Sequence, residues 1–332
     1  MTETFAVSDF DREIWESELE EFVPSRVFDA HAHVWHESCI GSAENAENLP
    51  AGWRAMLHLN TGFAELDAWN RQVFPGRELD FQLLGTPIPG CDFPQCHAFI
   101  GAEALKSPHH IASTCAAPEV TPQELDAAIR KYRFTGLKPY RVFAADPANC
   151  RITDYFPEPL IEVADQHGLA VTLHMARFHG IADPVNQEDL RMLTAKYPHV
   201  RWILAHCARA FNAFTLEKSV FLLRDLPNIW YDTSAVCDVR SHYLLMKHEN
   251  IERLMFGTDN IIAGGDHGKY VTWGRGWQFF AAKQQPHCVS DNTLVVYEQL
   301  RAQKQAADMA GLSASDLEKI FHANAEKFFG IN

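Results

Sequence analysis

The sequence of 332 residues contains no apolar run that approaches the roughly 18 residues of a membrane-spanning helix. Its first residues lack both the basic region and the apolar region of a secretory signal. The eight cysteines are scattered, with no Cys-x-x-Cys pair and no dense framework, which is typical of reduced thiols. We therefore expect a soluble, cytoplasmic protein with no membrane partner.

Positive charge is also scarce. The chain has 29 lysines and arginines against 43 acidic residues, a formal net charge of −14, which argues against a nucleic-acid partner. Hydrophobic residues make up 47% of the chain, which is an ordinary globular balance. This balance is compatible with a monomer and with a homo-oligomer. No internal repeat, linker or low-complexity stretch divides the chain, so a single domain is expected.

Short apolar runs alternate with helical stretches along the chain. Eight runs have the apolar character of strands that are buried on both faces: residues 27–34, 81–84, 111–115, 135–139, 169–174, 201–206, 229–233 and 254–258. Helical patterns fall between them, at residues 122–132, 157–167, 187–197 and 214–223. Eight strands that each lead toward a helix predict an α/β fold, the (β/α)₈ TIM barrel, ahead of an open doubly wound sheet.

Additional segments are expected before and after the barrel strands. An amphipathic pattern at residues 9–22 predicts that residues 1–26 form an N-terminal helical extension. The barrel strands then lie within residues 27–260, and residues 261–332 hold a lid loop and C-terminal helices. All of these belong to one metal-dependent barrel domain in this interpretation.

Two long loops are expected, after strands 1 and 8. The first covers residues 36–78 and contains a helix near residues 63–74, and the second covers residues 260–285. Aromatic residues of the second loop can cover a pocket and exclude water, or can pack as an ordinary closed loop: Tyr270, Trp273, Trp277, Phe279 and Phe280.

Side chains that bind metals cluster at the ends of the predicted strands. His31 and His33 stand two apart on the first strand, so they share one face with Cα atoms about 6.7 Å apart. His174 ends the fifth strand, His206 ends the sixth, and Asp259 follows the eighth. Because the C-terminal ends of strands in a parallel barrel meet at one mouth, we expect these side chains to converge there.

This joint pattern predicts a metal site. A single histidine at a strand end is more often a hydrogen-bonded structural residue, but five such side chains in a barrel-compatible order favour metal ligands. Neutral imidazoles with one hard carboxylate suit Zn²⁺ or Mn²⁺ better than Ca²⁺ or Mg²⁺. Zn²⁺ is the expected ion, with Mn²⁺ as the alternative.

Three arginines follow consecutive strands, just beyond the ends that carry these side chains: Arg141, Arg177 and Arg209. Guanidinium groups bind carboxylates through paired hydrogen bonds, so the pattern predicts a small anionic substrate, with Arg177 as the first choice. The alternative is that each arginine pairs with a nearby acid such as Asp146, Asp183 or Asp232.

The chain contains the stretches FDAHAHVW, TLHMAR, ILAHC and MFGTDN, followed by the tail IFHANAEKFFG. Together these motifs resemble the amidohydrolase superfamily, specifically its amidohydrolase-related (type 2) branch. The resemblance implies a distorted (β/α)₈ barrel with a divalent metal at its mouth. His31, His33, His174 and Asp259 match the metal ligands of that family. His206 matches a histidine that contacts substrate or activates water in single-metal members and binds a second metal in two-metal members.

Lys138 lies near the end of strand four. Two-metal members of the superfamily use a strand-four lysine, carboxylated by CO₂, as a bridging ligand. The alternative is a lysine that holds an anionic substrate or forms a salt bridge. A Gly-x-Lys at this place is common in the type 2 branch without two metals, so the resemblance favours one ion per chain.

Together with these residues, the resemblance implies a metal-dependent hydrolase that cleaves a C–O or C–N bond in a carboxylate-bearing lactone, ester or amide. Asp259 can take the proton of a metal-activated water, while His206 polarises the reacting carbonyl. Asp29 is a candidate for orienting the imidazoles. A non-oxidative decarboxylase of an unsaturated or aromatic acid is the alternative, and a barrel that has lost catalysis and only binds is a second one.

Overall fold

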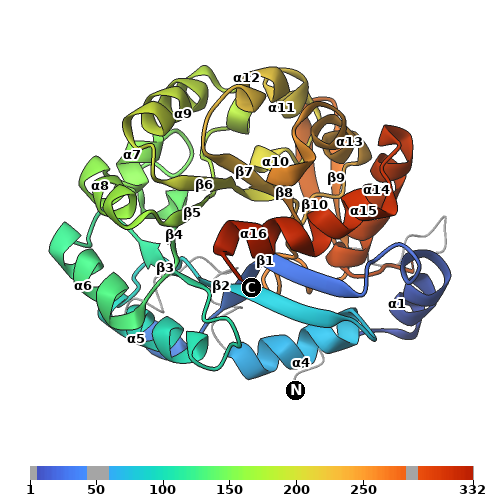
Figure 1. The fold of residues 1–332 in the computed structure, drawn as a ribbon, viewed down its shortest axis with the longest axis horizontal. Coiled ribbons are helices and arrows are strands. Elements are labelled where there is room, and N and C mark those ends of the chain that lie inside the picture. Colours follow the sequence, from blue (N-terminus) through green and yellow to red (C-terminus); the bar gives the residue numbers. More distant parts are fainter. Residues whose placement is uncertain (1–5, 43–59, 282–290, 332) are drawn as a thin grey trace.

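The computed structural model describes residues 6–42, 60–281 and 291–331. Eight parallel strands lie in sequence order around one barrel, with helices outside them (Figure 1). The strands are β1 (Arg26–Val34), β2 (Glu78–Gly85), β3 (Ala112–Ala116), β4 (Gly136–Pro139), β5 (Ala170–Leu173), β6 (Arg201–Leu204), β7 (Ile229–Asp232) and β8 (Leu254–Met255). Each overlaps one of the eight apolar runs, and the predicted TIM barrel is confirmed.

The barrel closes through the segment that follows β8. The N–H of Ala30 donates to the carbonyl of Phe256 at 2.9 Å, and the N–H of Asp259 donates to the carbonyl of His31 at 2.8 Å. Because these bonds join the chain after β8 to β1, closure of the barrel itself brings Asp259 beside the histidines of the first strand.

The outer helices bury an apolar face against the strands. They are α4 (Phe63–Val73), α5 (Phe93–Ala104), α6 (Pro122–Tyr132), α7 (Ile152–Tyr155), α8 (Glu158–His167), α9 (Pro184–Lys196), α11 (Phe214–Glu217), α12 (Val220–Arg224) and α13 (Val239–His248). The helical segments predicted between the strands overlap these helices, but α5, α7 and α13 lie outside them. The buried face of α5 combines Cys96, Ile100 and Ala104 with the less apolar His97, Gly101 and Glu103.

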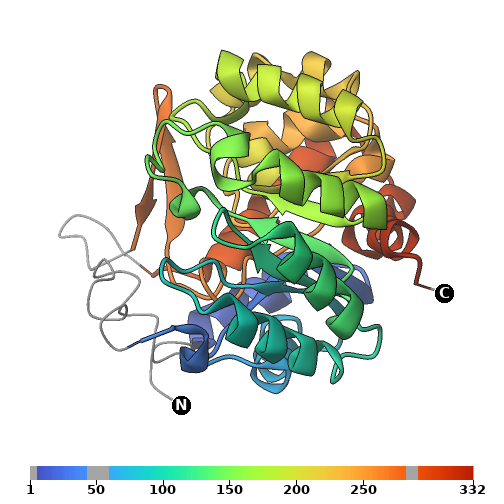
Figure 2. The ribbon, with the colours of Figure 1, turned by 90° about the vertical axis from the view of Figure 1, so that its left-hand side faces the viewer.

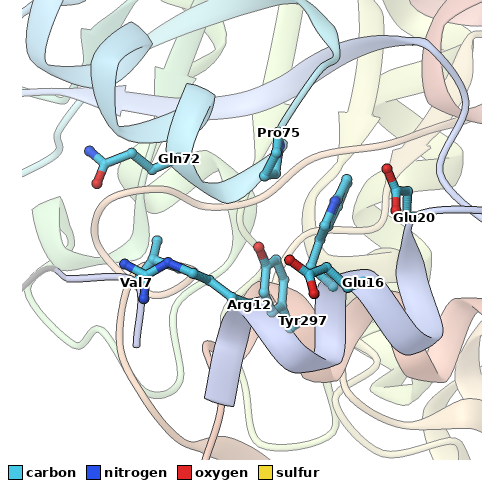
Figure 3. A pocket seen from close by; sticks show the side chains of 8 residues that line it. Val7, Arg12, Glu16, Glu20, Gln72, Pro75 and Tyr297 are labelled. Atoms are coloured by element: carbon cyan, nitrogen blue, oxygen red, sulfur yellow. The ribbon is translucent and has the colours of Figure 1, made fainter. Parts of the chain in front are cut away.

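The N-terminal extension begins with α1 (Asp9–Ile14), whose first turn is closed by a capping box between Ser8 and Asp11. It continues as a π-helical turn, Trp15–Leu19, and packs against α14 (Val295–Ala310). A cavity of 550 Å³ lies along this contact, between the extension, α4 and α14 (Figure 3). None of its lining residues comes from the C-terminal end of a strand.

The C-terminal helices α15 (Ala314–Glu318) and α16 (Asn324–Phe329) follow α14, and α16 contacts β1 and β8. Phe329 stacks on Phe28 of β1, with ring centroids 5.5 Å apart. Helix α16 therefore covers the end of the barrel at which β1 begins. A hairpin of β9 (Lys269–Trp273) and β10 (Gly276–Phe280) lies on the opposite side of the molecule from the C terminus (Figure 2).

The predicted lid loop therefore contains an antiparallel hairpin, which spans residues 269–280. Residues 282–285 of that predicted loop, and residues 43–59 of the loop after strand 1, lie outside the described residues. Across the described part of the chain, no helix has the length and apolar character needed to cross a membrane.

Candidate metal centre

The C-terminal ends of the strands surround a cavity of 210 Å³. Its walls include all but one of the residues predicted for the site: His31, His33, Lys138, Arg141, His174, His206, Arg209 and Asp259. The exception is Arg177. Their convergence follows from the parallel barrel, which brings the same end of every strand to one mouth.

Three candidate ligands form the tightest group in this cavity. Nε2 of His31 lies 3.3 Å from Nε2 of His33, and Oδ1 of Asp259 lies 3.4 Å and 3.3 Å from these two nitrogens. All three side chains are buried, and their ligand atoms lie within 4.8 Å of one another. Electron-pair donors this close together suit a shared cation, and two imidazoles with one carboxylate form a donor set for a divalent transition metal.

His174 lies in the same cavity but outside this tight group. Its Nδ1 lies 3.1 Å from the carbonyl oxygen of Met175. A carbonyl only accepts a hydrogen bond, so Nδ1 carries the proton and Nε2 keeps its lone pair. His174 therefore has the tautomer that a fourth ligand needs.

Burial sets the protonation states of the ligand group. It lowers the pKa of His31 to about 4 and lowers the pKa of His33 as well, so both imidazoles are neutral at pH 7. Burial opposes ionisation of Asp259, but the imidazoles of His31 and His33 hold the pKa of its carboxyl well below 3.8. Neutral imidazoles and an ionised carboxylate are the forms in which these side chains bind a metal.

His206 begins a left-handed turn that follows β6. Four consecutive residues, His206 to Arg209, have positive φ angles of 57°, 53°, 62° and 59°. A left-handed turn without glycine costs about 1–2 kcal/mol per residue, and such strain persists where surrounding contacts hold it in place. This turn places both its first and its last side chain on the cavity wall.

Two of the three arginines face the cavity without a carboxylate partner. Arg141 donates to the carbonyl of Pro147 at 2.9 Å, and Arg209 donates to the carbonyl of Arg177; neither forms an ion pair with a described residue. Burial, reinforced by nearby Arg141, lowers the pKa of Arg209 to about 10, so it stays charged. Arg177 instead pairs with Asp183 at 2.9 Å, which is the structural alternative to substrate binding.

The hairpin contributes an aromatic wall to the cavity. Tyr270 and Trp277 line it together with Phe211, whose ring lies 4.7 Å and 4.5 Å from theirs. The ring of Phe211 in turn lies 5.2 Å from that of His206. Of the other aromatic residues predicted to cover the pocket, Trp273 is 55% exposed and does not line it.

Asp232 and Ser234, at the end of β7, were not among the predicted site residues. Asp232 contacts Nδ1 of His31 at 2.9 Å, and the Ser234 hydroxyl lies 3.0 Å from Nδ1 of His206. Asp29 does not orient an imidazole: it accepts hydrogen bonds from the backbone of His31 and from Thr258. The position of Asp232 at a strand end was the signal available in the sequence.

The barrel, its mouth and its donor group define a member of the amidohydrolase class of barrel proteins. The amidohydrolase-2 family model, described as Amidohydrolase, matches residues 100–331. The chain belongs to this family of enzymes. No functionally curated protein matches it.

Solved structures share the fold at low sequence identity. One is 5-carboxyvanillate decarboxylase from Sphingomonas paucimobilis, with a TM-score of 0.55, 15% identity, and coverage of 93% of this chain and 100% of that one. Another is dihydroxybenzoic acid decarboxylase from Polaromonas sp. JS666 with bound manganese and the inhibitor 2-nitroresorcinol (TM-score 0.54, 14% identity, 94% and 98% coverage). At these identities the solved structures show the shared fold.

Proposed function

We propose that this protein is a metal-dependent hydrolase that cleaves a C–O or C–N bond in a small, carboxylate-bearing lactone, ester or amide. The observation that carries the proposal is one cavity that combines the ligand group around Asp259 with the unpaired arginines Arg141 and Arg209. A metal ion held by ligands of this kind supports attack by water, and two neighbouring guanidinium groups favour a substrate that carries a carboxylate. A cavity of about 150 Å³ holds a benzene ring, so 210 Å³ fits a substrate of one small ring with polar substituents.

His31, His33, His174 and Asp259 are the residues that would hold the ion, one per chain, with Zn²⁺ proposed and Mn²⁺ as the alternative. A divalent ion bound here supplies a Lewis acid and lowers the pKa of a coordinated water toward about 7. In this proposal Lys138 is a buried cation beside the ligands and does not bridge two metal ions. Burial lowers its pKa to about 8, so its amine is still mostly protonated at pH 7.

The side chains of this protein account for binding and proton transfer. Asp259 keeps 13% of its side chain exposed at the cavity, where its carboxylate can accept a proton from water and return it to the leaving group. Arg141 and Arg209 would hold the substrate carboxylate with charge-assisted hydrogen bonds. The aromatic wall formed with the hairpin excludes bulk water from the reacting bond.

A non-oxidative decarboxylase is the second candidate. The aromatic wall beside two arginines would also hold a planar aromatic acid, and several similar solved structures are decarboxylases of such acids.

The test is a substrate screen with metal-loaded protein and, as the control, the same protein treated with a chelator. We expect ring opening or bond cleavage, detected by proton release for carboxylated lactones or esters and by release of the amine for amides. CO₂ release from aromatic acids without hydrolysis would select the decarboxylase instead. Activity that is equal in the chelated control would contradict a metal-dependent reaction.

A further inference from the structure

Residues at the end of β7 contact two histidines of the site, His31 and His206. Oδ2 of Asp232 lies 2.9 Å from Nδ1 of His31. Oδ1 of Asp232 accepts hydrogen bonds from the backbone N–H groups of His206 and Ser234, both at 3.1 Å, and from the Ser234 hydroxyl. All four residues are buried, although β7 itself contributes no side chain to the cavity wall.

These contacts determine which ring nitrogen of His31 carries its proton. Three donors surround Oδ1 of Asp232, which favours the ionised carboxylate, and an ionised carboxylate can only accept. His31 therefore carries its proton on Nδ1. Its Nε2 keeps the lone pair, and this is the nitrogen that faces His33 and Asp259.

His206 is constrained in the same way by a different group. Its Nδ1 lies 3.0 Å from the carbonyl oxygen of Ser234, which also can only accept. The proton therefore stays on Nδ1, and Nε2 is left with a lone pair on the ring that lines the cavity.

We propose that Asp232 and Ser234 are positioning residues that fix His31 and His206 in the Nδ1-protonated tautomer, so that both present Nε2 to the cavity as an electron-pair donor. The inference rests on the proposed hydrolase site and refines it. Nε2 of His206 then accepts a hydrogen bond from the attacking water, whereas the sequence suggested that His206 polarises a carbonyl, which requires a donor. His31 gains the free nitrogen that a metal ligand needs.

The substitution Asp232→Asn should change the tautomer of His31 and leave that of His206 unchanged. The oxygen of the new amide must stay where Oδ1 lies, because three N–H or O–H donors point at that place. The amide nitrogen then faces Nδ1 of His31 and donates to it. His31 must change to the Nε2-protonated tautomer, which blocks its ligand nitrogen, while His206 keeps the backbone carbonyl of Ser234 and does not change.

The first measurement is nitrogen-15 NMR of the histidine rings in the metal-free protein, with signals assigned from His31→Gln and His206→Gln. We expect Nδ1–H for both rings in the native protein, and a change to Nε2–H for His31 alone in Asp232→Asn. An Nε2–H signal for either ring in the native protein would overturn the proposal, and this result does not depend on the folding of Asp232→Asn. The tautomers are observed without substrate or turnover, so a failure of the proposed hydrolase function would leave them unaffected.

The second measurement is zinc affinity, by competition with a chelating dye. Loss of an orienting carboxylate typically costs 10–100-fold in metal affinity, so we expect Asp232→Asn to bind Zn²⁺ about 10–100-fold more weakly. The matched control is Asp189→Asn, since Asp189 is an equally buried carboxylate that bonds Arg151 and does not line the cavity. Native affinity in Asp232→Asn, or an equal loss in Asp189→Asn, would contradict a positioning role.

Discussion

Nζ of Lys138 lies 2.9 Å from Nε2 of His31, the nitrogen that faces the other candidate ligands. This contact places a buried cation beside the ligand group and bears directly on the number of metal ions. A lysine that bridges two ions is a ligand, whereas an ammonium at this distance repels an approaching cation.

We therefore expect Lys138→Met to bind one divalent ion per chain, at least as tightly as the native protein. Removal of a like charge favours the metal, and Met preserves much of the side-chain volume. Metal analysis of both proteins after dialysis is the measurement. Two ions in the native protein, with loss of metal from the variant, would identify a bridging lysine instead.

Asp259→Asn is expected to lower kcat by about 100-fold or more, with a smaller change in KM, because a proton-transfer group acts mainly in the transition state. The amide preserves the shape of the side chain but cannot accept the proton. Steady-state kinetics must be measured at full metal loading, since Asp259 is also a proposed ligand. Unchanged turnover in a fully loaded sample would exclude this residue from proton transfer.

Arg209→Met and Arg177→Met form a matched pair. Arg209 faces the cavity without an acidic partner, so its loss should raise KM about tenfold or more, the effect of one charge-assisted hydrogen bond. Arg177 pairs with Asp183, and its variant should keep the native KM. Equal KM values in both variants and the native enzyme would show that Arg209 does not bind the substrate.

Asp11 ties the N-terminal extension to the rest of the chain in a pH-dependent way. Burial opposes its ionisation, but hydrogen bonds from His267, Thr293 and Ser8 outweigh burial and hold the pKa of its carboxyl well below the ordinary 3.8. A lowered pKa stabilises the fold above pH 3.8, and this stabilisation is lost progressively as the pH falls below that value.

Asp11→Asn should therefore lower the free energy of unfolding by about 1–3 kcal/mol at pH 7, and by less at pH 3. Urea unfolding at both pH values measures the difference. The control is Asp9→Asn, which changes an exposed carboxylate on the same helix. A loss of stability that is equal at pH 7 and pH 3 would show that the effect is not electrostatic.

Arg133→Gly should increase stability. Arg133 ends α6 in the left-handed region, at φ 56° and ψ 43°, where a side chain is strained and glycine is not. We expect a gain of about 0.5–1 kcal/mol. Ala127→Gly, at an exposed position within the same helix, should instead lose about 1 kcal/mol. Thermal unfolding compares the two, and destabilisation by Arg133→Gly would contradict the argument.

The barrel could be predicted from the sequence because strands that are buried on both faces read as apolar runs over a few residues. The spacing of His31 and His33 also follows from the local chain, since alternate residues of a strand share a face. Hairpin β9–β10 was not predicted, because its positions show no regular alternation of buried and exposed residues: Tyr270 and Trp277 line the cavity, whereas Trp273 and Phe280 are exposed.

The sequence alone determined the barrel and the strand ends from which its candidate ligands come, because both depend on apolar patterning within single elements. Only the tertiary structure decided which arginines face the cavity. Arg177 meets Asp183 across its loop, while the left-handed turn that starts at His206 directs Arg209 to the cavity wall. It also decided that Asp232 lies beside His31, because a contact between β7 and β1 depends on how distant strands pack, and no local pattern in the sequence records that distance.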